Sequence, residues 1–231
     1  MNLARLAALT AATFVLLCGS ALAQQTDAAV IAAQKPLYPA TTCLVSGEEL
    51  GSGGMVAVDL VHEGRLITLC CKGCIKGFEK DPAAHIAKLD AAVTAAQQAG
   101  YPLKTCIVSD EALDDRPTRV VHAGKLVLLC CSGCRKDFVA APQTYMPKLD
   151  KAYIDAQLKD YPLDTCLIRG EELGTSPVSV LHGLQLVQLC CRNCAAQFAK
   201  DPAPALKKLA EVRAARTPAA KPAESGESAD G

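Results

Sequence analysis

From Tyr38 onward, the chain repeats one arrangement of hydrophobic and polar positions with a period of about sixty residues. Each copy begins at a Tyr-Pro pair, continues through two short runs rich in β-branched and aliphatic residues, and ends in a helical stretch. A fixed period of this kind is typical of tandem structural units. We expect an N-terminal segment at 24–37, units at 38–90, 101–150 and 161–210, and helical linkers at 91–100 and 151–160.

Each unit contains a predicted β-hairpin. In the first unit the β-favouring runs 56–62 and 65–70 are separated by Glu63-Gly64, a pair typical of a two-residue turn. The second unit has Ala123-Gly124 at this place. In the third unit His182-Gly183 comes one position earlier, so we expect a shifted turn there.

Alternation along the second strand predicts which of its faces is buried. Ile67 and Leu69 share one face, while Thr68 lies on the other. The same pattern recurs in the other units, with Val127 and Leu129 opposite Leu128, and Val187 and Leu189 opposite Gln188. We therefore expect the first of these faces to be the core face.

Two helices are predicted after each hairpin. A phenylalanine lies four residues after the last cysteine of each unit, one helical turn along: Phe78, Phe138 and Phe198. Asp81-Pro82 and Asp201-Pro202 indicate an N-cap and a first helical residue for the second helix, whereas Ala141-Pro142 lacks the cap. In the first unit this helix should end at Gly100.

The two ends of the chain are predicted to lie outside the units. Residues 1–23 carry Arg5, then an apolar run, then Ala21-Leu22-Ala23, which is the pattern of a cleaved signal peptide. We therefore expect a periplasmic or secreted protein without stable membrane insertion after cleavage; an uncleaved anchor is the alternative. Residues 211–231 form a predicted tail that is disordered from about Thr217.

Composition and charge narrow the possible functions. The chain has 24 basic and 24 acidic side chains, so we expect no nucleic-acid partner. It is 4% aromatic, lacks tryptophan and has 13 cysteines. Units of about fifty residues with so few large side chains need a cross-link, either a metal ion or disulfides. Apart from Cys18 in the signal segment, every unit owns four cysteines: Cys43, Cys70, Cys71 and Cys74; Cys106, Cys130, Cys131 and Cys134; Cys166, Cys190, Cys191 and Cys194.

The spacing of the cysteines favours a metal ion over disulfides. Cys70 and Cys71 end a strand, Cys74 lies one turn into a helix, and Cys43 reaches the group from a loop near Ser46-Gly47. Such sulfurs can converge on one tetrahedral ion. A disulfide between adjacent cysteines would be strained. Export still permits disulfides, so a disulfide framework stays open.

The repeated motif resembles a known family. The run Tyr-Pro-x-x-Thr-Cys, followed by a hairpin and Leu-Cys-Cys-x-x-Cys-x-x-x-Phe, is similar to the YHS and TRASH group of cysteine-rich heavy-metal-binding domains. The resemblance implies an α+β fold of three small treble-clef-like modules, each with a loop knuckle, a hairpin and a helix. The ligands that it implies are Cys43, Cys70 and Cys74; Cys106, Cys130 and Cys134; Cys166, Cys190 and Cys194.

The remaining cysteine of each unit has two interpretations: Cys71, Cys131 and Cys191. Each is either a fourth ligand or a buried thiol that faces the core beside residues such as Ile67 and Leu69.

Histidines are not expected among the ligands. With Glu63-Gly64 as the turn, His62 pairs with Arg65, and Cys70 lies five residues further along the second strand, or roughly 16 Å away at about 3.3 Å per residue. His122 and His182 stand at the same place, and we expect all three at hairpin tips. His85 is expected on a helix surface.

These features together predict a metal-binding protein and not an enzyme. No recurring Ser/His/Asp set or phosphate-binding glycine loop accompanies the cysteines. The expected function is heavy-metal binding after export, with Zn²⁺ as the first choice of ion and Cu(I) as the second. The ions would be structural or would be buffered and passed to a metal-delivery partner. The alternative is a disulfide-stapled interaction protein or a thiol-disulfide redox protein that uses Cys71 and Cys74.

Overall fold

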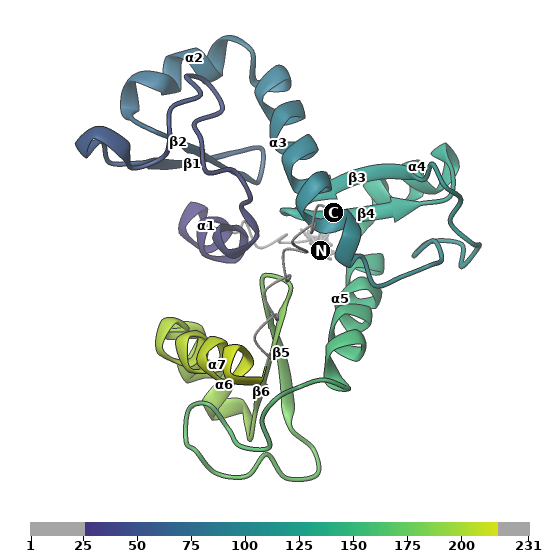
Figure 1. Cartoon of the computed structure of the whole chain (residues 1–231). Coiled ribbons are helices and arrows are strands. Elements are labelled where there is room, and N and C mark those ends of the chain that lie inside the picture. The colour runs from purple at the N-terminus through teal and green to yellow at the C-terminus, as the bar shows by residue number, and fades with distance from the viewer. Residues whose placement is uncertain (1–25, 217–231) are drawn as a thin grey trace, which may run out of the picture.

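The computed structural model describes residues 26–216 (Figure 1). It contains three antiparallel two-stranded hairpins, each followed by helices, so the fold is α+β as the sequence predicts. None of the helices in this part of the chain is long and apolar enough to cross a lipid bilayer. The predicted signal peptide 1–23 and the tail from Thr217 lie outside the described residues.

Each unit contains a hairpin followed by two α-helices. Unit 1 consists of η2 (Ser52–Gly54), β1 (Val58–His62), β2 (Arg65–Leu69), η3 (Lys72–Cys74), α2 (Ile75–Lys80), α3 (Pro82–Gln97) and η4 (Gln98–Gly100). Unit 2 consists of β3 (Thr118–His122), β4 (Lys125–Leu129), α4 (Ser132–Ala140) and α5 (Pro142–Leu158). Unit 3 consists of β5 (Val178–His182), β6 (Gln185–Leu189), α6 (Arg192–Lys200) and α7 (Ala203–Arg216). The segments 91–100 and 151–160 largely continue α3 and α5.

The second helices of units 1 and 2 begin as their sequences predict, whereas α7 of unit 3 begins at Ala203 and not at the predicted Pro202. Asp81 accepts a hydrogen bond from the Ala84 N–H at 3.1 Å and so caps α3. Ala141 offers no such bond to α5. The last helix, α7, extends further than expected, because 211–216, assigned from the sequence to the tail, belong to it.

The predicted two-residue turns are confirmed in units 1 and 2. In unit 1 His62 pairs with Arg65, and Glu63 and Gly64 between them have φ angles of 49° and 75°. Two consecutive residues with positive φ form the turn type that matches the twist of a hairpin. The second turn residue in both units is glycine, which adopts this conformation without steric cost.

The hairpin of unit 3 corrects the expected shift of its turn. His182 pairs with Gln185, which is the register of the other two units. Gly183 takes the first turn position with a φ of 63°, and Leu184 does not have a positive φ. This is the pattern of a type II′ turn, which places glycine first. Because both turn types contain two residues, moving the glycine leaves the register unchanged.

Both faces of the second strand are buried, which corrects the prediction of a single core face. Ile67 and Leu69 are fully buried in one cluster with Phe78, as expected. On the opposite face, Leu66 and Thr68 are each only 1% exposed. Helix α1 (Asp27–Gln34) packs against this hairpin, and α3 and α5 pack in the same way against the hairpins of units 2 and 3. The second face is therefore covered by the helix that precedes each hairpin.

Two side chains hold the free edge of each second strand. In unit 2 Gln97 donates from Nε2 to the Gly124 carbonyl at 2.8 Å, and its Oε1 accepts from the Leu126 N–H at 2.8 Å. The Tyr101 hydroxyl accepts from the Leu128 N–H at 3.1 Å. An edge strand otherwise leaves such N–H groups unpaired, so these side chains take the place of a third strand. Equivalent bonds recur at Gln34 and Tyr38 and at Gln157 and Tyr161.

Helix α1 and the short turn η1 (Lys35–Leu37) occupy the segment 24–37, where no helix is predicted. Helix α1 packs against the hairpin of unit 1 in the same way as the ends of α3 and α5 pack against the hairpins of units 2 and 3. A signal for them exists in the sequence, since Gln-x-x-x-Tyr-Pro recurs before every unit, at Gln34, Gln97 and Gln157. Each hairpin therefore depends on the helix that comes before it.

Replacing one of the edge-holding hydroxyls should destabilise the protein. Tyr101→Phe leaves the Leu128 N–H without its partner, at an expected cost of about 1–3 kcal/mol. Tyr153 provides the matched control, because its buried hydroxyl has no hydrogen-bond partner among the described residues. Tyr153→Phe should be neutral or stabilising. Urea unfolding of the two variants beside the unchanged chain measures the difference, and equal losses would contradict the edge role of Tyr101.

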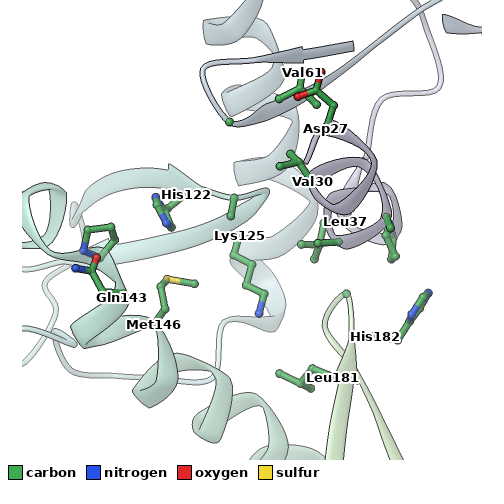
Figure 2. Close-up of a pocket in the computed structure, with 17 residues that line it drawn as sticks. Asp27, Val30, Leu37, Val61, His122, Lys125, Gln143, Met146, Leu181 and His182 are labelled. Atoms are coloured by element: carbon green, nitrogen blue, oxygen red, sulfur yellow. The ribbon is translucent and has the colours of Figure 1, made fainter. Parts of the chain in front are cut away.

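The three hairpin tips meet around α1 and η1. A Cβ added to Gly183 would lie 3.1 Å from the Pro36 carbonyl oxygen, so this tip approaches the η1 backbone closely. A cavity of about 1220 Å³ lies between the tips, and residues of all three hairpins line it, including Val61, Lys125 and Leu181 (Figure 2). The cysteines lie at the other ends of the hairpins, away from this cavity.

Candidate metal centres

The first cysteine of each unit lies in a tight loop. The Cys43 N–H donates to the Glu48 carbonyl at 2.7 Å, and the Gly47 N–H donates to the Cys43 carbonyl at 2.9 Å. Thr42 and Glu49 form a bridge that closes the loop. Gly47 has a φ of 78°, and a positive φ recurs at the equivalent Asp110 (64°) and Gly170 (72°). We call this loop, residues 42–49, the knuckle of unit 1, and its equivalents the knuckles of units 2 and 3.

The other cysteines lie where the hairpin meets the helix. Cys70 follows β2 directly, Cys71 has an extended backbone with a φ of −160°, and Cys74 is the last residue of η3. Phe78 lies four residues after Cys74, is 1% exposed and belongs to the same core cluster as Cys43 and Cys70. The buried ring therefore helps to fix the helix that carries Cys74.

Three sulfurs of each unit converge, and we call each group an inner triangle. Its sulfur atoms all lie within 4.8 Å of one another. The groups are Cys43, Cys70 and Cys74; Cys106, Cys130 and Cys134; Cys166, Cys190 and Cys194. The Sγ–Sγ distance from Cys70 to Cys74 is 3.6 Å, close to the edge of about 3.8 Å that Zn–S bonds of 2.3 Å give in a tetrahedron. These are the groups that the resemblance implies.

All twelve cysteines in the described part of the chain are free thiols. Their closest sulfur contacts, 3.6–4.0 Å, are far longer than an S–S bond of about 2.05 Å. Soft thiolates at this spacing suit Zn²⁺ or Cu(I). The three groups could therefore each hold a metal ion.

The fourth cysteine of each unit is more accessible than the first. Cys43, Cys106 and Cys166 are at most 2% exposed. By contrast Cys131 is exposed, and Cys71 and Cys191 are half-buried. The interpretation as a buried core thiol is therefore wrong for Cys131, whereas Cys71 and Cys191 pack against the edge of their core clusters without being fully buried.

Hydrogen bonds in the knuckle favour a thiolate at its cysteine. Burial by itself would raise the pKa of Cys43, but bonds from the Ser46 hydroxyl and from nearby backbone N–H groups outweigh it and lower the pKa to about 6. The same balance lowers the pKa of Cys106 and Cys166 to about 7. Burial and the neighbouring sulfurs of Cys70 and Cys43 raise the pKa of Cys74 to about 12. One thiolate thus forms readily in each group, and a metal would have to displace the proton of Cys74.

The surroundings of the three sites differ. Ser46 lies 3.4 Å from the Cys70 sulfur, and Ser109 lies 3.4 Å from the Cys130 sulfur. Unit 3 has Arg169 in place of this serine. In unit 2 the Glu111 carboxylate also lies 3.3 Å from the Cys130 sulfur. At site 3 the equivalent carboxylate, Glu171, pairs with Arg169 at 2.8 Å, whereas at site 2 the Glu111 carboxylate faces the sulfur, so the sites are electrostatically unequal.

The hairpin-tip histidines have a packing role. The His62 ring packs edge-on against Phe78 with ring centroids 5.2 Å apart. His122 and His182 pack in the same way on the phenylalanines of their units. None of them belongs to the sulfur groups, as the sequence predicts.

His85 corrects the expectation of a surface histidine. Its Nδ1 lies 2.9 Å from the Leu44 carbonyl oxygen, and its ring stacks on Phe78 at 5.9 Å. Because Leu44 follows Cys43 directly, His85 braces the knuckle of unit 1 from its helix.

Comparison with protein-family models, curated proteins and solved structures finds no match to this chain.

Proposed function

We propose that the protein binds three metal ions, one in each inner triangle. The observation that carries this proposal is the threefold recurrence of three sulfurs within 4.8 Å of one another. The three copies differ at many other positions, yet the knuckle, the strand end and the helix start bring the same three cysteines together each time. A chance cluster would not recur in this way.

The proposed ion is soft or borderline, Zn²⁺ first and Cu(I) second. All three donors are thiolates, which exclude hard ions such as Mg²⁺ and Ca²⁺. The YHS and TRASH resemblance supports a heavy metal. The leader-like residues 1–23 support action after export, in the periplasm or outside the cell. We propose buffering or delivery of the ion to a partner, and no catalysis.

Unequal sites support buffering more than a purely structural role. Arg169 lies near the sulfurs of unit 3, and its pKa is raised by Glu171 first and then by the Cys190 sulfur. Because Arg169 also neutralises Glu171, no uncompensated carboxylate there would oppose an anionic metal–thiolate group. Glu111 in unit 2 would act against it. We therefore expect the three ions to bind with graded affinity, with site 3 tighter than site 2.

Metal stoichiometry tests the proposal. The reduced full chain is loaded with Zn²⁺, freed of excess metal, and subjected to elemental analysis and to thiol titration before and after chelation. We expect three ions per chain, one for each sulfur group. The matched control, C43S/C106S/C166S, should bind none of the three with comparable affinity. A metal-free product with its twelve cysteines paired in disulfides would contradict the proposal and favour the disulfide alternative.

A further inference from the structure

The sulfurs of units 1 and 3 form a second triangle, on the outer side of the first. In unit 1 the Cys71 sulfur lies 3.9 Å from that of Cys70 and 4.0 Å from that of Cys74. In unit 3 the Cys191 sulfur lies 3.9 Å from that of Cys190 and 3.6 Å from that of Cys194. We call Cys70, Cys71 and Cys74, and Cys190, Cys191 and Cys194, the outer triangles.

The two triangles of a unit share one edge. Cys70 and Cys74, 3.6 Å apart, belong to both. The inner triangle adds Cys43, which is 2% exposed, and the outer one adds the half-buried Cys71. An ion that stays bound to the shared edge can therefore exchange one sulfur for the other by a short movement.

We propose that the outer triangles of units 1 and 3 are the entry and exit sites through which ions reach the inner triangles. This inference rests on the proposed function. The incoming species is a Zn²⁺ or Cu(I) ion carried by an exchangeable thiol or chelator. Its natural partner is a donor that presents a thiolate at the protein surface, because Cys71 and Cys74 are the half-buried sulfurs of this triangle, beside the buried Cys70.

Exchange proceeds by substitution of one ligand at a time. Metal–sulfur bonds to Cys71 and then to Cys70 and Cys74 form one at a time as the bonds to the donor break, so the donor keeps its own ligands. Each thiol that is still protonated releases its proton to the solvent as it binds. A bond to Cys43 then forms as the bond to Cys71 breaks, and Cys71 takes up a proton again. The ion keeps its oxidation state throughout, so no oxidant or reductant is needed. Release follows the same steps in reverse.

Unit 2 differs from the other two units in the exposure of its fourth cysteine and in a carboxylate beside its site, and it serves as the internal comparison. The Cys131 sulfur accepts a hydrogen bond from the Cys134 N–H at 3.5 Å and so caps helix α4. Cys131 is exposed, and the Glu111 carboxylate lies beside Cys130. We therefore expect site 2 to exchange more slowly than the other two sites.

The test is the rate of metal transfer from the loaded full chain to a chromophoric chelator. For C71S/C191S we expect three bound Zn²⁺ at equilibrium, as in the unchanged chain, and transfer from two of the three sites slowed by about 10-fold or more. C131S should leave the rates close to those of the unchanged chain. C71D/C191D, which restores an anionic ligand, should recover much of the rate.

The outcomes separate this inference from the proposed function. If the unchanged chain binds no metal, the proposed function itself fails. If it binds three ions and C71S/C191S loses two of them with an unchanged circular dichroism spectrum, the fourth cysteines are fixed ligands and the exchange role is wrong. Transfer from C71S/C191S at the rate of the unchanged chain would also overturn it. If the serine variant unfolds, the number of bound ions and the transfer rate are measured for C71D/C191D instead.

Discussion

Removing the metal from the reduced chain should lower its melting temperature by tens of degrees. Each unit buries little aromatic surface, and its knuckle, strand end and helix start are joined mainly through the inner triangle. An ion present at a thousand times its dissociation constant adds about 4 kcal/mol to the folded state. For a unit of this size, that corresponds to a shift of about 15–30 °C. Thermal unfolding with and without a chelator measures the effect.

The control for this experiment is C43S/C106S/C166S, whose melting temperature should depend much less on the chelator, because only the outer triangles remain to hold an ion. If the chelator does not change the melting temperature of the reduced, metal-loaded chain, the prediction that a bound ion stabilises the fold is wrong.

Lowering the pH should also release the metal ion. A metal ligand must be deprotonated. Cys43 has a pKa of about 6, so it is already deprotonated when the pH is above 6. Cys74 has a pKa of about 12, so it must lose its proton when the metal binds. As the pH falls through 6, Cys43 also takes up a proton that the metal must displace. Below pH 6 the affinity should therefore fall by an additional factor of about ten per pH unit, compared with its fall above pH 6. Chelator competition between pH 5 and pH 8 measures this slope.

Replacing the phenylalanine beneath a metal site should be the most damaging change outside the cysteines. Phe138 is fully buried, contacts His122 and Tyr145 with its ring, and lies four residues after Cys134 on α4. Phe138→Ala should cost about 3–5 kcal/mol, because it removes apolar contact and leaves a cavity. Hydrogen exchange of the amides of β4 in the metal-loaded chain reports this loss for unit 2 alone.

The adjacent residue gives a matched control. Val139 lies on the same helix and is 60% exposed, so Val139→Ala should change the stability by less than about 0.5 kcal/mol. Phe138→Ala should also weaken metal binding at site 2, since the ring positions the helix that carries Cys134. Equal exchange rates in the two variants would show that the ring does not support the site.

The chain itself shows which pairs of positions depend on each other. Arg65 forms an ion pair with Asp90, and Lys125 forms one with Asp150 at 2.5 Å. Unit 3 has Gln185 and Ala210 at these positions and has therefore lost both partners together. Such paired loss is expected where two side chains serve only each other.

Local spacing determined much of the structure. Glu63-Gly64 specifies a two-residue turn, and the turn specifies that His62 faces Arg65 and that Cys70 leaves the far end of the strand. Asp81 specifies the start of α3. Three cysteines on a knuckle, a strand end and a helix start then meet because these elements are short and rigid. The turn, the helix cap and the Cys70–Cys74 pair each lie within a few residues, whereas Cys43 joins them from a separate loop.

Tertiary packing decided the remainder. The alternation that marks Ile67 as buried says nothing of Thr68, which is buried only because the preceding helix and Tyr38 cover the other face of the strand. Gln34 holds a backbone more than thirty residues away, and no local pattern assigns it a partner. The exposure of Cys131 likewise depends on how its side chain caps α4. A sequence pattern encodes how a residue relates to its neighbours along one element, whereas burial and hydrogen-bond partners are set by elements that come from elsewhere in the chain.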